Sequence, residues 1–235
     1  LDARVKPGKG GTLWLSWGAP FEGEGAISEW EPGKRFQWVE ERPAAEKGAD
    51  PVRIVVDFHL ESRGGKTILR LVQSGFGDSQ SWNDEFDATS QGWGWCFAAL
   101  RHYLEQQLGR RRTATFGFAM VPAERRDAWT KLTGASGFRL ASGSFASLKP
   151  GDRYALVAGP HRFEGRVLLC KPDYYFGGTL ENLGNGLLWI EVNRSSGSSM
   201  PALLFSTFGE PTPATAAAHD WMKPSIDRLF PKPKE

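Results

Sequence analysis

The stretch ILRLVQSGFGDSQSW, residues 68–82, has a near-copy far downstream in ALLFSTFGEPTPATAAAHDW, residues 202–221. In each stretch an apolar run ends in a Ser-x-Phe-Gly tetrapeptide, and a tryptophan follows. The pattern predicts a strand, a glycine that ends it and a turn toward a helix. Because this order is written twice, we expect two related structural units.

A longer alignment supports a duplication, since residues 25–41 match residues 165–182 in the same order. The matched pairs are Gly25 and Gly165, Ile27 and Val167, Pro32 and Pro172, Phe36 and Phe176, Glu41 and Glu181, and, later, Trp93 and Trp221. Their spacing only shrinks along the chain, as it does when loops shorten in one copy while strands are kept. We therefore predict one domain over residues 1–109 and a second over 110–235.

The segment from Thr113 to about residue 140 has no counterpart in the first copy. TATFGFAMV, residues 113–121, predicts a strand, and a proline followed by AERRDAWTKL predicts a short helix. The first domain is therefore expected to lack one strand and one helix, unless they lie upstream of Leu1. Such a sheet would keep an unpaired edge, which a second copy of the chain could cover in a homodimer.

The strand and helix patterns point to an α+β protein. VRIVVDFHL, residues 52–60, alternates, with Phe58 on one face and Asp57 and His59 on the other. A Gly-Gly turn leads to a partner strand, and the remaining strands also follow in hairpin order, which favours antiparallel sheets. A long helix is expected from about residue 90 to residue 108. Its apolar stripe comprises Trp93, Phe97, Leu100, Leu104 and Leu108.

Three motifs of the first copy resemble a known family. They are EPGKRFQW at 31–38, T-x-L-R-L-x-x-S-G-F at 67–76, and a helix that opens with GW and continues with L-x-x-Y-L-E, residues 92–105. Over residues 10–106 the chain resembles the activator of heat-shock protein 90 ATPase homologues, within the START-like or SRPBCC superfamily. The resemblance implies a helix-grip fold, in which a curved antiparallel sheet wraps a long C-terminal helix around a cavity. In the second copy, Pro224 is expected to make that helix irregular.

Composition and motifs exclude several classes of function. Ten tryptophans and 40% hydrophobic residues among 235 describe a globular protein, and a net charge of +2 gives no electrostatic case for nucleic acid. No apolar stretch approaches the length of a membrane span. Two cysteines without a CxxC motif or signal peptide favour a cytoplasmic location. The acidic group Asp84, Glu85 and Asp87 is expected in the loop before the long helix. No catalytic motif or metal-ligand cluster is found, so we predict no catalytic residue, metal or cofactor.

Large aromatic side chains are the remaining candidates for a site, as walls of a ligand cavity. The candidates are Trp38, Phe58, His59, Trp93 and Phe97 in the first copy, and Phe118, Tyr175, Trp189 and Phe205 in the second. The same residues could simply fill two solid cores, and periodicity alone does not separate the two interpretations.

Three functions compete. We favour a noncatalytic protein that binds a hydrophobic small molecule, as the superfamily resemblance implies. The family name implies instead a co-chaperone-like module that binds a chaperone or another protein. The third is a cyclase or aromatase of the same superfamily, for which a buried His or carboxylate in the cavity would be needed. If the face that carries Asp57 and His59 is concave, that enzymatic interpretation gains.

Overall fold

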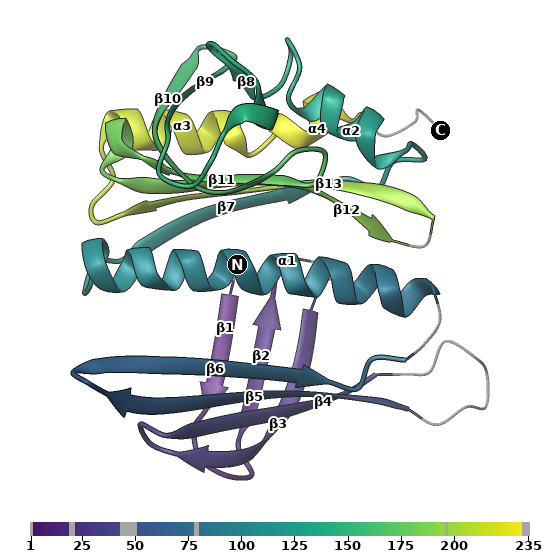
Figure 1. Cartoon of the computed structure of the whole chain (residues 1–235), viewed down its shortest axis with the longest axis vertical. Helices are drawn as coiled ribbons and strands as arrows, with labels where there is room; N and C mark the ends of the chain where they lie inside the picture. The colour runs from purple at the N-terminus through teal and green to yellow at the C-terminus, as the bar shows by residue number, and fades with distance from the viewer. Residues whose placement is uncertain (1, 19–21, 43–50, 78–79, 196, 232–235) are drawn as a thin grey trace. The chain divides into compact units, whose positions relative to one another are not determined.

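The protein is described by a computed structural model that covers residues 2–18, 22–42, 51–77, 80–195 and 197–231. The chain divides into two compact units, residues 1–78 and 79–235 (Figure 1). The protein is α+β, and each unit has a single antiparallel sheet, as the sequence predicts. No helix in these described ranges is long and apolar enough to cross a membrane.

The first unit is a six-stranded sheet in which each strand pairs with its neighbour in the chain. The strands are β1 (Asp2–Lys6), β2 (Thr12–Ser16), β3 (Glu22–Glu31), β4 (Arg35–Arg42), β5 (Val52–Arg63) and β6 (Lys66–Ser74). Gly64 and Gly65 form the predicted turn between the last two strands, with φ angles of 58° and 72° that favour glycine. The sequence does not predict the strand β1, because it is only five residues long and has two apolar residues, Ala3 and Val5, and all five residues are exposed.

The outer edge of β6 pairs with no other strand among the described residues, and the described part of this unit contains no helix. The repeat register predicts that the first copy lacks the strand and helix that precede the equivalent sheet of the second copy. This stays a prediction, because the long helix expected within residues 1–109 is grouped with residues 79–235.

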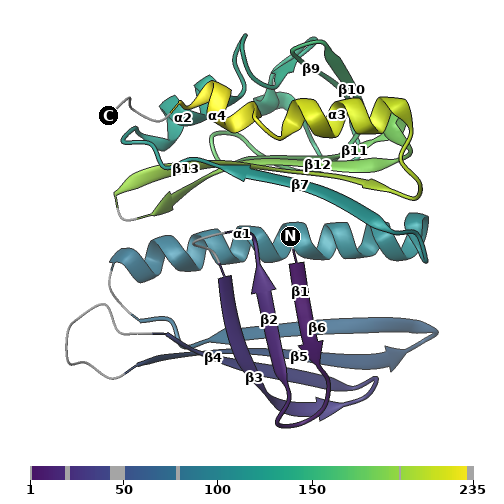
Figure 2. The ribbon, with the colours of Figure 1, turned by 180° about the vertical axis from the view of Figure 1, so that it is seen from behind.

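The second unit is a seven-stranded sheet in the order β7-β13-β12-β11-β10-β9-β8. The strands are β7 (Arg112–Phe118), β8 (Arg139–Leu140), β9 (Arg153–Ala158), β10 (His161–Lys171), β11 (Tyr175–Leu180), β12 (Gly186–Ser195) and β13 (Ser198–Phe208). One face is covered by α2 (Arg125–Leu132), α3 (Pro213–Met222) and α4 (Ser225–Leu229) (Figure 2). An antiparallel sheet that curves around a C-terminal helix is the helix-grip arrangement that the resemblance implies.

The C-terminal helix is interrupted at Pro224, as predicted. The helix α3 ends at Met222, and α4 begins at Ser225 with the proline at its N-cap position. A proline inside a continuous helix would leave one carbonyl without its N–H partner, so the chain restarts the helix instead.

The space between this sheet and α3 is a packed core. Its centre is formed by aromatic and aliphatic side chains with no more than 1% exposure, among them Phe138, Phe163, Phe176, Phe205 and Leu156. Side chains at this density leave few voids larger than a water molecule. In the described part of the second unit, the aromatic residues between the sheet and α3 therefore form a solid core and not the wall of a cavity.

The long helix α1 (Gln80–His102), followed by the π-helical turn Tyr103–Gln107, packs on the other face of the same sheet. It begins ten residues earlier than expected, so Asp84, Glu85 and Asp87 lie inside the helix and not in the loop before it. The domain boundary predicted from the sequence, after residue 109, assigns this helix to the first copy. In the structure, the helix belongs to the compact unit of residues 79–235. The boundary between the duplicated copies stays a prediction.

The face of α1 that meets the sheet is not the predicted stripe. The packed residues are Trp95, Ala98, Ala99 and Tyr103. Leu100, Leu104 and Leu108, which continue the predicted stripe, are 42%, 53% and 69% exposed. The helix has apolar residues on two faces. The spacing of apolar residues in the sequence indicates the longer stripe, but it does not show which of the two faces packs on a sheet.

Candidate functional site

The sheet of the first unit presents two chemically different faces, because side chains alternate along each strand. In β4 and β5, Phe36 pairs with Phe58, and Gln37 pairs with Asp57. In this part of β4 and β5 the even-numbered residues therefore form an aromatic face, and the odd-numbered residues form a polar face on the opposite side of the same sheet.

The aromatic face gathers four half-buried rings, Trp30, Phe36, Trp38 and Phe58. The centroid of the Phe36 ring lies 5.6 Å from Trp30, 5.9 Å from Trp38 and 5.8 Å from Phe58, and Trp38 and Phe58 are 6.0 Å apart. Two predicted site residues, Trp38 and Phe58, thus meet. Trp30 and Phe36 were not predicted, although their cross-strand position beside those two could have indicated them.

Gly25 on β3 explains how the Trp38 ring lies against the sheet. A Cβ atom at Gly25 would stand 2.5 Å from Cδ1 of Trp38 and 2.7 Å from the backbone oxygen of Val39. Only glycine leaves room for the indole at this point.

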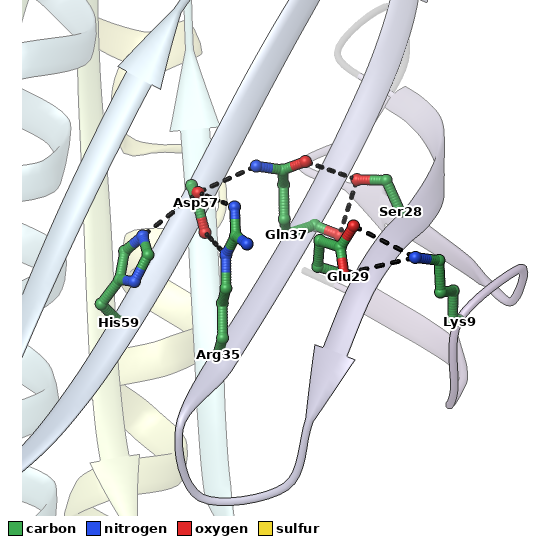
Figure 3. Close-up of polar contacts among 7 residues, drawn as sticks. All are labelled: Lys9, Ser28, Glu29, Arg35, Gln37, Asp57 and His59. Atoms are coloured by element: carbon green, nitrogen blue, oxygen red, sulfur yellow. Dashed lines mark hydrogen bonds and ion pairs between the residues drawn. The ribbon is translucent and has the colours of Figure 1, made fainter.

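The polar face carries a network around Asp57 (Figure 3). Its carboxylate accepts hydrogen bonds from Nε and Nη2 of Arg35 at 3.1 and 2.8 Å and from Nε2 of Gln37 at 2.8 Å. Nε2 of His59 lies 3.1 Å from the same carboxylate. The hydroxyl of Ser28 donates to Oε1 of Gln37 at 2.8 Å, which extends the network to β3.

The electrostatics of this network oppose proton transfer. The hydrogen bonds from Arg35, helped by Gln37 and His59, lower the pKa of Asp57 to about 2. Such a carboxylate is a weak base at neutral pH, far from the range that suits a general base. The side chain of Asp57 is 13% exposed, so little space remains for a substrate beside it. The network serves to tie three strands together.

His59, predicted as a cavity residue, is separated from its predicted partners by the sheet itself. It stands on the polar face, with its side chain 44% exposed, whereas Trp38 and Phe58 stand on the aromatic face.

The candidates of the second unit do not share one space. Tyr175 and Trp189 stack with centroids 4.9 Å apart on the face that α1 covers, and Phe118 lies on that face of β7 beside Phe116. Phe205 points to the opposite face, where it is fully buried in the core beneath α3. Trp93 and Phe97 stack on each other at 6.1 Å along α1, on a different side of the helix from Trp95.

His219 is buried in the core of the second unit. No sequence motif indicated it as a functional residue. Nδ1 of His219 is 2.7 Å from the hydroxyl of Thr115, and its Nε2 is 2.9 Å from the hydroxyl of Thr207. Burial, with Lys223 nearby, lowers the pKa of His219 and favours the neutral ring. Both ring nitrogens are occupied, so this histidine holds the α3 helix to β7 and β13.

One depression opens on the second unit near β8, β9 and β10, with a volume of about 350 Å³. Its lining residues are Leu140, Ser142, Leu148, Arg153, Tyr154, Ala155, Glu164 and Gly165. None of them was predicted as a site residue. In the residues that the structure describes, no group of three or more His, Cys, Asp or Glu side chains could hold a metal ion.

Comparison with protein families gives one match. Residues 1–105 match the model of the family described as "Activator of Hsp90 ATPase homolog 1-like protein". The match confirms the resemblance predicted for the first copy from its three motifs. Among curated proteins, no match to the chain is found.

Several solved structures are similar to the chain at low identity. The solution structure of the Aha1 dimer from Colwellia psychrerythraea is 12% identical, covers 52% of this chain and 99% of that one, and has a TM-score of 0.39. The di-domain ARO/CYC BexL from the BE-7585A biosynthetic pathway is 14% identical, covers 98% and 88%, and has a TM-score of 0.37. The di-domain ARO/CYC StfQ from the steffimycin biosynthetic pathway is 13% identical, covers 97% and 86%, and has a TM-score of 0.36.

Proposed function

We propose that this chain is a noncatalytic START-like protein that binds a hydrophobic small molecule on the aromatic face of its first unit. The observation that carries the proposal is the cluster of Trp30, Phe36, Trp38 and Phe58, whose four rings lie within 6.0 Å of a neighbour and are only half-buried. Half-buried aromatic rings on one sheet face offer a large apolar contact area to a ligand.

The second unit supports the choice of the first as the ligand site. Its grip layer is filled by its own side chains, with Phe163, Phe176 and Phe205 all fully buried. A ligand there would have to displace well-packed core residues, at a cost of several kcal/mol, on the order of that for a large core substitution.

The state of the titratable groups supports a noncatalytic role. Asp57 is held as a carboxylate by Arg35, and both nitrogens of His219 are occupied by threonine hydroxyls. A cyclase would need such a group to face its substrate with a free acceptor or donor.

Native mass spectrometry of the gently purified full chain tests the proposal. We expect extra mass that disappears on denaturation, and we expect the Phe58→Leu and Trp38→Leu variants to lose it. Phe116→Leu is the matched control, since Phe116 is a half-buried aromatic residue on β7 of the second unit. A clean unliganded mass for the wild type, with normal folding by circular dichroism, would contradict the proposal.

A second candidate is a co-chaperone-like module, which the family of residues 1–105 favours. In this alternative the same aromatic face contacts a protein and not a small molecule. Analytical size-exclusion chromatography with purified heat-shock protein 90 distinguishes the two functions. The co-chaperone function is favoured if the chain carries no small molecule, forms a complex with heat-shock protein 90, and loses that complex in the Trp38→Leu variant.

A further inference from the structure

The depression on the second unit is lined by residues of β8, β9 and β10 and of the segment that joins β8 to β9. Its volume of about 350 Å³ lies at the lower end of the range of small-molecule sites. The lining combines apolar residues, Leu140, Leu148 and Ala155, with three polar side chains, Ser142, Arg153 and Glu164. A lining of this kind suits a small ligand that carries one apolar group and a few polar ones.

Two opposite charges of this lining stand on the same face of the β9–β10 hairpin. Arg153 is paired with Arg166 across the two strands, and Ala155 is paired with Glu164. Because paired residues share a face and side chains alternate along a strand, Arg153 and Glu164 occupy diagonal positions on one face. Residues in such positions are roughly 7 Å apart, which is close enough for long side chains to meet. In the described chain, however, Arg153 and Glu164 form no ion pair with each other.

Each of the two charges is held by a partner outside the depression. Nη2 of Arg153 donates a hydrogen bond to Oε2 of Glu181 at 2.8 Å. Nε of Arg162 donates to Oε1 of Glu164. Neither Glu181 nor Arg162 belongs to the lining residues. The two outer ion pairs therefore keep the guanidinium and the carboxylate apart, so that the depression offers one cation and one anion to a ligand.

Both side chains keep unused hydrogen-bonding capacity. A guanidinium has five N–H donors, and Nη2 is the only nitrogen of Arg153 that bonds to a described residue. Oε2 of Glu164 accepts no hydrogen bond from the described part of the chain. The side chains of Arg153 and Glu164 are 73% and 47% exposed. A ligand can therefore reach these atoms from solvent without breaking either outer ion pair.

We propose that this depression binds a small zwitterion, an α-amino acid with an apolar side chain. The carboxylate of the ligand accepts hydrogen bonds from Arg153, since a guanidinium fits a carboxylate with two parallel N–H donors. The ammonium group of the ligand donates to Oε2 of Glu164, and its apolar side chain contacts Leu140 and Leu148. A ligand with only one of the two charges would leave the opposite charge of the lining without a partner. The site lies within the second unit and uses none of the four rings of the aromatic face.

The test is a titration of the isotope-labelled full chain with L-leucine at neutral pH, followed through the backbone amide signals in heteronuclear NMR. We expect saturable shifts of the amides of Ala155 and Gly165, which both line the depression. The dissociation constant should be on the order of 1 mM, because both charges of the site are exposed to solvent. The Glu164→Gln and Arg153→Gln variants should each bind L-leucine at least about threefold more weakly than the wild type.

Matched control variants break the same ion pairs from outside the depression. Arg162→Gln removes the partner of Glu164, and Glu181→Gln removes the partner of Arg153. Because neither change alters the lining, both variants should bind L-leucine at least as tightly as the wild type. Exposed ion pairs contribute little to folding, so all four variants should fold, which circular dichroism checks. If the control variants lose as much affinity as Glu164→Gln and Arg153→Gln, the lining charges do not bind the ligand and the proposal is wrong.

Three ligand controls test the chemical class of the ligand. Isocaproate lacks the ammonium group of leucine, isoamylamine lacks the carboxylate, and glycine lacks the apolar side chain. Saturation by any of them with the affinity of L-leucine would overturn the assignment to an apolar amino acid. The site itself would be overturned by the absence of saturation in the folded wild type, or by saturable shifts confined to residues 1–78. An unchanged affinity in both Glu164→Gln and Arg153→Gln would also overturn it.

Discussion

The ring of Trp95 stacks on the ring of Trp189, with centroids 4.9 Å apart and an angle of 19° between the planes. This contact fixes α1 on the sheet of the second unit, on the face opposite the α3 helix. It is possible because Gly177, which pairs with Trp189 across β11 and β12, has no side chain to hold the rings away.

Replacement of Gly177 by Ala should loosen this contact. The added Cβ would stand 2.7 Å from Cε3 of Trp189 and 2.8 Å from Cζ3 of Trp95, so the rings must move. We expect the free energy of unfolding to fall by about 1 to 3 kcal/mol, as in overpacked cores. Urea denaturation of the full chain measures it. Gly92→Ala on α1, where a Cβ meets nothing within 4 Å, is the control and should stabilise slightly. Equal stability of Gly177→Ala and wild type would disprove the account.

Removal of the charge of Asp57 should destabilise the first unit. Asp57→Asn keeps the shape but weakens the hydrogen bonds from Arg35, which are charge-assisted in the wild type. Because Arg35 is 34% exposed, water offsets part of the loss, and we expect a decrease of about 1 kcal/mol in the free energy of unfolding. Asp2→Asn, which breaks only an ion pair of two exposed side chains, serves as the comparison and should change nothing measurable.

The same carboxylate should make stability depend on pH in the acid range. The pKa of Asp57 is about 2 in the folded chain against an ordinary 3.8, so the unfolded chain takes up its proton first as the pH falls. The contribution of Asp57 is complete above about pH 5 and is lost as the pH falls through 3.8 toward 2. The difference in unfolding free energy between wild type and Asp57→Asn should shrink over that interval. A difference that stays constant down to the lower limit would contradict the assigned pKa.

The core histidine should behave as one unit with its two threonines. His219→Leu leaves the hydroxyls of Thr115 and Thr207 buried without their partner, and we expect a loss of about 2 to 3 kcal/mol in the free energy of unfolding. In the triple variant His219→Leu, Thr115→Val, Thr207→Val, all three polar groups are gone, so much of that stability should return. If the loss of unfolding free energy in the triple variant equals the sum of the losses in the three single variants, the three residues are not coupled.

The homodimer expected from the sequence should form through the outer edge of β6. Ile68 and Val72 of this strand are 43% and 39% exposed, and no strand of the described chain pairs with that edge. Analytical ultracentrifugation should find a dimer that Val72→Lys dissociates, because charged side chains on an edge strand oppose pairing. Val5→Lys, at the 51% exposed Val5 of the opposite edge strand β1, should leave it intact. A wild type that is monomeric at all concentrations would exclude this interface.

Strand positions, the Gly-Gly turn and the interruption at Pro224 could be predicted from the sequence. Each depends on the backbone preferences of a few consecutive residues, or on an alternation that a strand imposes over its own length. The separation of Phe58 from Asp57 and His59 follows from the same alternation. The amino-acid sequence by itself therefore determined the α+β class, the antiparallel order, the family resemblance of the first copy and two of the four rings of the aromatic face, Trp38 and Phe58.

Only the tertiary structure decided which of these residues meet. The Thr115 partner of His219 lies 104 residues away along the chain. The choice of the Trp95 face of α1 over the Trp93 face depends on the flat space that Gly177 leaves beside Trp189. Such contacts depend on the shape of two surfaces that are distant in sequence, and no local pattern records that shape.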